Sequence, residues 1–161
     1  MLLPFPRAQE ESGSTTFLLL TQLLPCSFSL ISATTPEDQE RFVSSIIKSL
    51  DSGDPAYQRS TATCRAYLFR AELYTLWKRF DAAKADAERG IQLLQMTEDS
   101  STRSLLLSQL YRVLSDIHEA NENWQGAMAA LRAQAASNQS MRSKVAKELE
   151  RLQERAAGVT I

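Results

Sequence analysis

The side chains best suited to chemistry in this sequence are a single histidine, His118, and two cysteines, Cys26 and Cys64. A zinc site needs three or four such ligands at short, recognisable spacings, and these three residues are too few and too widely separated to supply them. No glycine-rich loop or nucleophile motif accompanies His118. We therefore expect no catalytic residue, no metal and no cofactor. We interpret His118 as a histidine packed in the core or at its rim, and Cys64 as a small buried hydrophobe.

Two pairs of carboxylates could in principle perform general acid–base work: Asp81 with Asp86, and Glu119 with Glu122. Both pairs lie in highly charged stretches of helical character, so we expect them to form solvated helix faces. The formal net charge of the whole chain is −1. This balance offers no basic surplus to neutralise phosphates, which argues against a nucleic-acid partner.

Residues 1–34 differ from the rest of the sequence and are expected to form a disordered or hydrophobic N-terminal segment. Phe17 to Ala33 is the most apolar run, but Pro25 interrupts it and leaves it too short for a membrane span. A cleaved targeting segment is the sharper alternative, although Glu10 and Glu11 oppose the positive charge that such a segment normally carries. A hydrophobic flap on the first helices and a wrongly assigned start also remain open. We expect a cytoplasmic protein, or a secretory or organellar one if residues 1–33 are cleaved.

From Thr35 onward the pattern is helical. Thr35 supplies an N-cap hydroxyl and Pro36 suits the first turn, so a helix should begin there. Its apolar face is predicted at Phe42, Ile46, Ile47 and Leu50. The expected helices cover residues 35–50, 56–78, 81–96, 99–120, 124–137 and 140–157, the second being unusually long, and no strand is predicted.

An internal repeat organises these helices. A pattern of small and aromatic residues beginning at Tyr67 returns 44 residues later at Tyr111 with the same spacing throughout. Small residues are expected where two antiparallel helices approach closely, and aromatic residues are expected to fill the gaps beside them. The small residues are Ala71, Ala83, Ser115 and Ala127, and the aromatic residues are Tyr67, Tyr74, Phe80, Tyr111 and Trp124. A partial echo 44 residues upstream aligns Val43, Ile46 and Ile47 with Ala87, Gly90 and Ile91.

These residues resemble the tetratricopeptide repeat family over about residues 64–141, most closely from Ala71 to Leu94 (AELYTLWKRFDAAKADAERGIQLL). The second copy departs from the family pattern at His118, where an aromatic is expected, and at Gln134, where a small apolar residue is usual. The longer period implies an extended variant of a unit of about 34 residues. The resemblance implies an all-α fold, in which antiparallel helix pairs stack as a short right-handed superhelix with a C-terminal capping helix.

The resulting division of the chain has four helical parts after the N-terminal segment. A half repeat covers residues 35–55, complete repeats cover 56–97 and 98–139, and the capping helix covers 140–157. The whole helical domain spans residues 35–161. Its last helix carries an apolar stripe from Met141 to Leu152 for packing on the second repeat, and its charged residues are expected to face solvent.

The resemblance also implies a binding surface, because the first helix of each pair lines the inner face of such an array. The side chains expected on it are Arg65, Leu68, Glu72, Thr75, Gln109, Arg112, Asp116 and Glu119. They would bind an extended peptide or a partner helix, with Leu68 as the aliphatic contact and the charges selecting the sequence. The alternative is that these side chains are merely solvated and the true contacts lie elsewhere.

The expected function is a non-catalytic scaffold or adaptor, and the chain could be one subunit of a larger complex. Some family members clamp a C-terminal carboxylate on this face, but Glu72, Asp116 and Glu119 would repel one, so we predict against that ligand. Two further functions stay open. One is a targeted or membrane-associated assembly factor that uses residues 17–33, and the second is an enzyme on a helical scaffold.

Overall fold

A computed structural model describes residues 35–53, 60–98 and 100–158. The predicted N-terminal segment, residues 1–34, lies outside this part of the chain. Six α-helices are described, together with a 3-10 turn, η1 (Gln139–Met141), and the described residues contain no strand, which confirms the all-α prediction. The helices are α3 (Pro36–Asp51), α5 (Thr61–Leu76), α6 (Phe80–Gln95), α7 (Ser101–Ala120), α8 (Trp124–Ser137) and α9 (Arg142–Ala156).

The chain divides into two compact units, Met1–Gln39 and Glu40–Ile161. The described part of the first unit is the start of α3. There the Asp38 backbone N–H donates to the Thr35 hydroxyl oxygen at 3.3 Å, so the predicted N-cap is present. The second unit begins within α3 at Glu40 and contains the other described helices.

The start of α5 differs from the prediction. The helix begins at Thr61 rather than near Ala56, because Ser60 has extended backbone angles and its hydroxyl accepts from the Thr63 N–H at 3.3 Å. With 16 residues, α5 is not unusually long. The aromatic Trp77 lies just after its last residue and is half-buried.

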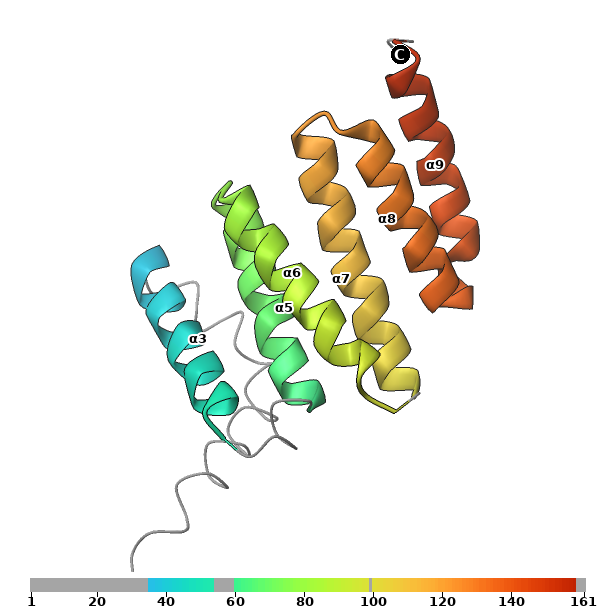
Figure 1. Cartoon of the computed structure of the whole chain (residues 1–161). Coiled ribbons are helices and arrows are strands. Elements are labelled where there is room, and N and C mark those ends of the chain that lie inside the picture. Colours follow the sequence, from blue (N-terminus) through green and yellow to red (C-terminus); the bar gives the residue numbers. More distant parts are fainter. Residues whose placement is uncertain (1–34, 54–59, 99, 159–161) are drawn as a thin grey trace, which may run out of the picture. The chain divides into compact units, whose positions relative to one another are not determined.

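Two helix pairs repeat the same local geometry. In Figure 1, α5 lies antiparallel beside α6, and α7 lies antiparallel beside α8. The turn inside each pair contains one left-handed residue that is not glycine, Lys78 at φ 59° and Glu122 at φ 56°. The next N–H then donates back to the helix at 2.8 Å in both turns, from Arg79 to the Tyr74 carbonyl and from Asn123 to the His118 carbonyl.

The same 44-residue period extends to α3. Its bounds, Pro36–Asp51, precede those of α6, Phe80–Gln95, by 44 residues at both ends. This offset is the same as that of the partial sequence echo, which aligns α3 with α6.

The predicted small residues all lie in the core. Ala71, Ala83 and Ala127 are completely buried, and Ser115 is nearly so. The Ser115 hydroxyl donates to the Ala127 carbonyl oxygen at 3.3 Å, which joins α7 directly to α8. The aromatic residues divide into two groups, since Tyr67 and Tyr74 are buried whereas Phe80, Tyr111 and Trp124 are half-buried.

The apolar face of α3 is rotated from the predicted one. Phe42 is 54% exposed, and Val43 is buried instead, together with Ile47 and Leu50. Residues 43, 47 and 50 follow the i, i+4, i+7 spacing of one helix face, and Phe42 falls outside it. The prediction for Phe42 is therefore wrong.

Long polar side chains connect α3 to the first pair. The Tyr67 hydroxyl donates to Asp51 at 2.7 Å and the Tyr74 hydroxyl donates to Glu40 at 2.9 Å. The bond from the Tyr74 hydroxyl is the largest cause of the lowered pKa of Glu40. At the other end of the unit, α9 packs on α8 through Met128, Leu131, Val145 and Leu152. Of the predicted apolar stripe, Val145 and Leu152 are buried, and Met141 and Leu149 are partly buried against the same core.

Candidate functional site

The eight predicted site residues are distributed over three levels of exposure. Arg65, Gln109 and Arg112 are exposed, and Glu72, Thr75, Asp116 and Glu119 are half-buried. Leu68 is only 7% exposed and belongs to the core. The prediction that Leu68 supplies an aliphatic contact is therefore wrong, because almost none of its surface is left for a partner.

An exposed leucine that sequence reasoning missed lies two turns further along α5. Leu76 is 69% exposed and follows Glu72 by four residues, so the two side chains lie on one face of the helix. The helical register alone could have found it, since Leu68, Glu72 and Leu76 are spaced four apart. Leu76, and not Leu68, is therefore the exposed leucine beside Glu72.

Glu72 is the least satisfied charged group of the surface. Its carboxylate has no hydrogen-bond or ion-pair partner among the residues that the structure describes. Burial raises the pKa of Glu72 above its ordinary value, since removing water penalises the charged form. Its neighbour Thr75 is satisfied within the helix, where its hydroxyl donates to the Ala71 carbonyl at 2.8 Å. Glu72 is thus able to accept a donor from a partner.

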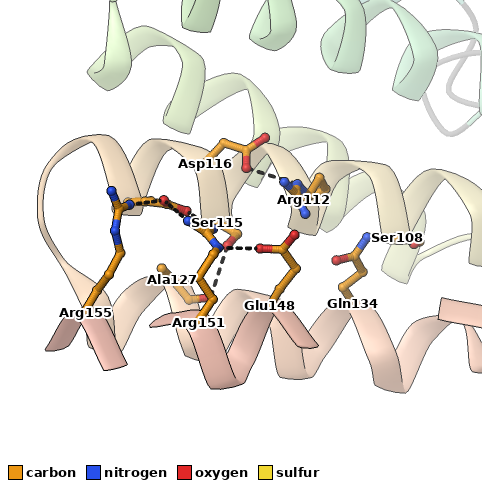
Figure 2. A network of polar contacts seen from close by, with 10 residues as sticks. Ser108, Arg112, Ser115, Asp116, Ala127, Gln134, Glu148, Arg151 and Arg155 are labelled. Carbon is orange, nitrogen blue, oxygen red and sulfur yellow. Dashed lines mark hydrogen bonds and ion pairs between the residues drawn. The ribbon is translucent and has the colours of Figure 1, made fainter. Parts of the chain in front are cut away.

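In the second helix pair, the position equivalent to Glu72 is Asp116, which forms an ion pair. Arg112 Nε lies 3.0 Å from Asp116 Oδ1, with both side chains 44% exposed. Figure 2 shows the two side chains side by side on α7. Burial raises the pKa of Asp116, and the charge of Arg112 opposes that rise. A pair this exposed contributes little to stability, so its groups remain able to exchange partners.

Glu119 is held by the capping helix. Arg151 donates to both of its carboxylate oxygens at 2.8 Å, and Arg155 adds a third bond at 2.6 Å. Arg151 also donates to Glu148 within α9 at 2.9 Å. The Arg151 bond lowers the pKa of Glu119. Figure 2 shows the side chains of Arg151 and Arg155 extending from α9 toward α7.

This clamp corrects two expectations. Glu119 was expected to lie on a solvated face and to contact a partner, but Arg151 and Arg155 both form ion pairs with it. The predicted solvated charges of the last helix are also partly engaged, since Arg151 and Arg155 face α7. Sequence spacing gave no signal of this, because 32 residues separate Glu119 from Arg151.

The prediction of a solvated Asp86 is wrong as well. Asp86 is only 6% exposed, whereas Asp81 is exposed as expected. Arg70 forms a bidentate pair with Asp86 at 2.6 and 2.7 Å, and its remaining nitrogen donates to Ser44 at 3.0 Å. The hydrogen bonds to Asp86 raise the pKa of Arg70. This pair joins α3, α5 and α6 and is structural.

His118 lies at the rim, at the end of α7. Its Nδ1 lies 3.3 Å from the amide nitrogen of Asn123, and burial lowers its pKa. A Cβ added at Gly126 would come within 2.8 Å of His118 Nδ1, so the glycine makes room for the ring. Cys64 is also expected to be unreactive, because burial raises the pKa of its thiol to about 11. In the described ranges no group of three or more His, Cys, Asp and Glu residues could hold a metal ion.

Comparisons with known proteins do not assign a family. No family model matches the chain, and no curated protein or solved structure matches it either. Within the described helices, none is long and apolar enough to cross a membrane.

Proposed function

We propose that this chain is a non-catalytic interaction module of tetratricopeptide-repeat type. It binds a peptide or partner helix on one face of its helix pairs. The observation that carries the proposal is the half-buried, unpaired carboxylate of Glu72, with no partner in the described residues, beside the exposed Leu76. The repeated pair geometry supports it, since stacked helix pairs present the first helix of each pair as a continuous surface.

The chemistry of this surface favours a partner with a basic side chain next to an apolar one. A lysine or arginine would neutralise Glu72 and return its pKa toward the ordinary range. Leu76 would bury apolar area against the neighbouring residue of the partner, at about 25 cal/mol per Å² removed from water. Exposed Arg112 and Asp116, which form an ion pair, would then select polar residues in the neighbouring part of the bound partner.

The predicted residues Arg65 and Gln109 are exposed but lie outside the surface that we propose. Glu119 does not contribute a free charge, since Arg151 and Arg155 occupy it. The binding surface we propose is therefore shorter than the one inferred from the sequence and consists of Glu72, Thr75, Leu76, Arg112 and Asp116.

We further propose that the pairs stack as a short right-handed superhelix and that the protein acts as a cytoplasmic scaffold or adaptor, in a larger complex. The alternative of a targeted assembly factor depends on residues 17–33, which lie outside the described residues.

A direct test compares the binding partners of surface variants of the full chain. Glu72→Lys and Leu76→Asp should each remove the same partners from a quantitative affinity capture, and Arg112→Glu should weaken them. Arg132→Glu, an exposed charge reversal on α8, is the matched control and should retain them. Circular dichroism should show that all four variants keep their helix content. Unchanged partners after both Glu72→Lys and Leu76→Asp would remove the proposed surface.

A further inference from the structure

The turn between α7 and α8 contains two hydrogen-bonded side chains whose donor and acceptor roles are set by the backbone. The Gly126 N–H donates to Asn123 Oδ1 at 3.0 Å, which makes Asn123 the N-cap of α8. The amide nitrogen of the same side chain lies 3.3 Å from His118 Nδ1. Because an amide nitrogen has N–H donors and no acceptor, His118 Nδ1 must accept and carries no proton. The neutral ring therefore holds its proton on Nε2.

The backbone keeps these two side chains next to each other. The Asn123 N–H donates to the His118 carbonyl oxygen at 2.8 Å, so the two residues are also tied through the main chain. Gly126 lies directly against both side chains, since a Cβ added there would come within 2.8 Å of Asn123 Nδ2 and of His118 Nδ1. The lack of a side chain at Gly126 therefore leaves the space in which the ring and the amide meet.

The equivalent turn of the first pair is built differently. At the corresponding positions, 44 residues earlier, the chain carries Tyr74, Arg79 and Ala82. Arg79 occupies the N-cap position of α6 but makes no side-chain cap bond, and its guanidinium lies 4.7 Å from the centre of the Tyr74 ring. Neither tyrosine nor arginine changes charge near neutral pH. Of the two turns, the second is therefore the one held by a side chain that titrates in this range.

The surroundings of the His118 ring also favour its neutral form. Burial is the largest cause that lowers the pKa of His118, Lys84 on α6 lowers it further, and Glu88 opposes them. Lys84 and Glu88 also form an ion pair with each other at 3.8 Å. On α8 the one charged residue is Arg132, six residues beyond Gly126 and so about 9 Å along the axis. The other charges near the end of α7 are the exposed Glu122 and Glu119, which is paired with Arg151 and Arg155 of α9.

We propose that His118 and Asn123 form an acid-sensitive cap, which loosens the start of α8 when the ring is protonated. A proton on His118 Nδ1 places two donors opposite each other, so the bond to the Asn123 amide nitrogen is lost. The amide then rotates to offer its oxygen to the ring and withdraws that oxygen from the Gly126 N–H. The next residue, Ala127, accepts the Ser115 hydroxyl at 3.3 Å, so the loosening begins beside a contact that joins α7 to α8.

The pH range of this cap is separate from that of the Glu119 clamp. Because the pKa of His118 is lowered in the folded chain, its contribution to stability is complete above the ordinary value of 6.5. That contribution is lost as pH falls through the lower folded value. The pKa of Glu119 is lowered from 4.5, so the clamp is lost in stronger acid. Neither His118 nor Asn123 belongs to the surface around Glu72 and Leu76, so a failure of that surface would leave the cap intact.

The first test determines which ring nitrogen carries the proton. His118 is the single histidine of the chain, so its ring signals are identified without further assignment. Long-range ¹H–¹⁵N correlation NMR of the full ¹⁵N-labelled chain, recorded at neutral pH, distinguishes the two tautomers. We expect the proton on Nε2 and none on Nδ1. A proton on Nδ1, or an equal mixture of both tautomers, would overturn the proposal.

A variant that keeps the cap but reverses the hydrogen bond to the ring gives the sharper test. Aspartate caps a helix as well as asparagine, so Asn123→Asp should keep the bond from the Gly126 N–H. The second carboxylate oxygen can only accept, so the neutral ring should move its proton to Nδ1. The matched control, Asn121→Asp, adds the same charge at an exposed position of the same turn and should leave the proton on Nε2. An unchanged tautomer in Asn123→Asp, or the same change in both variants, would contradict the proposed contact.

Hydrogen exchange of the Gly126 amide measures the cap itself. In the parent chain its protection, corrected for the intrinsic pH dependence of exchange, should fall about fivefold as the ring is protonated, as expected for one N-cap bond. In Asn123→Asp the protection should stay constant over the same pH range, because the ionised carboxylate still accepts from the Gly126 N–H. Protection that does not follow the titration of His118 in the parent, or that falls equally in both chains, would overturn the proposal.

Discussion

The two helix pairs share the 44-residue register and the same turn, but residues of different polarity occupy one equivalent interior position in each pair. In the first pair, Arg70 and Asp86 form a nearly buried ion pair. The residues 44 positions later are Leu114 and Ala130, which are buried and apolar. The features common to both pairs are therefore the small residues at the helix interface and the left-handed residue in the turn. The polarity of this interior position is free to vary, and the ion pair additionally reaches Ser44 on α3.

The largest expected effect comes from breaking this ion pair on one side. Asp86→Ala leaves the Arg70 guanidinium without its partner in a mostly buried site and should cost about 3–5 kcal/mol of unfolding free energy. Urea denaturation followed by circular dichroism measures this. The double change Arg70→Leu with Asp86→Ala copies the second pair and should recover most of the loss. If the double variant is as unstable as the single one, the two pairs are not interchangeable at this position.

The turn of the second pair should be sensitive to an added methyl group. Gly126→Ala places a Cβ 2.8 Å from His118 Nδ1 and should destabilise the protein by about 1–2 kcal/mol, because overpacking outweighs the better helix propensity of alanine. In the first pair the equivalent residue is Ala82, opposite Tyr74 rather than histidine. Thermal unfolding of the variant measures the effect. In a His118→Ala background, Gly126→Ala should stabilise the protein instead. If it still destabilises the protein there, the histidine ring is not the obstacle.

The clamp on Glu119 should make stability depend on pH. Its pKa is lowered in the folded chain, so its contribution is present above the ordinary glutamate pKa and is lost as pH falls through the folded value. Glu119→Gln should therefore cost about 1 kcal/mol at neutral pH, and the difference from the parent should vanish in acid. Urea titrations at several pH values measure it. A difference that persists unchanged in acid would show that the carboxylate charge is not responsible.

Glu72 should behave in the opposite sense, with the smallest effect. Its pKa is raised, so the folded chain loses stability as pH rises through that value, when the half-buried carboxylate ionises. Glu72→Gln should stabilise the unbound protein by about 0.5 kcal/mol at neutral pH and have no effect in acid. Thermal unfolding at both pH values provides the measurement. A destabilised Gln variant would mean that Glu72 is paired in solution, and the proposed binding surface would lose its main support.

Local sequence signals predicted most of the fold. The bounds of α8 follow the prediction, and those of α3 and α6 deviate by one residue, because caps and apolar periodicity are encoded within a few residues. The sequence did not predict the start of α5 correctly, because Ser60 is only one of several nearby residues that could cap the helix. The binding surface was predicted less well. Exposure of Leu68 and Leu76 depends on which side of α5 its neighbours cover, and that is not a local property.

By itself, the sequence determined the all-helical fold, the 44-residue register and the small residues at the interface of each pair. These features depend on short-range backbone preferences and on side-chain volume, which a single chain segment already expresses. Only the tertiary structure decided which charges are paired. Arg70 with Asp86 and Arg151 with Glu119 are 16 and 32 residues apart, and Glu72 has no partner among the described residues. Pairing between distant charges depends on the positions that packed helices impose, so the same side chains could have been solvated, structural or free to bind.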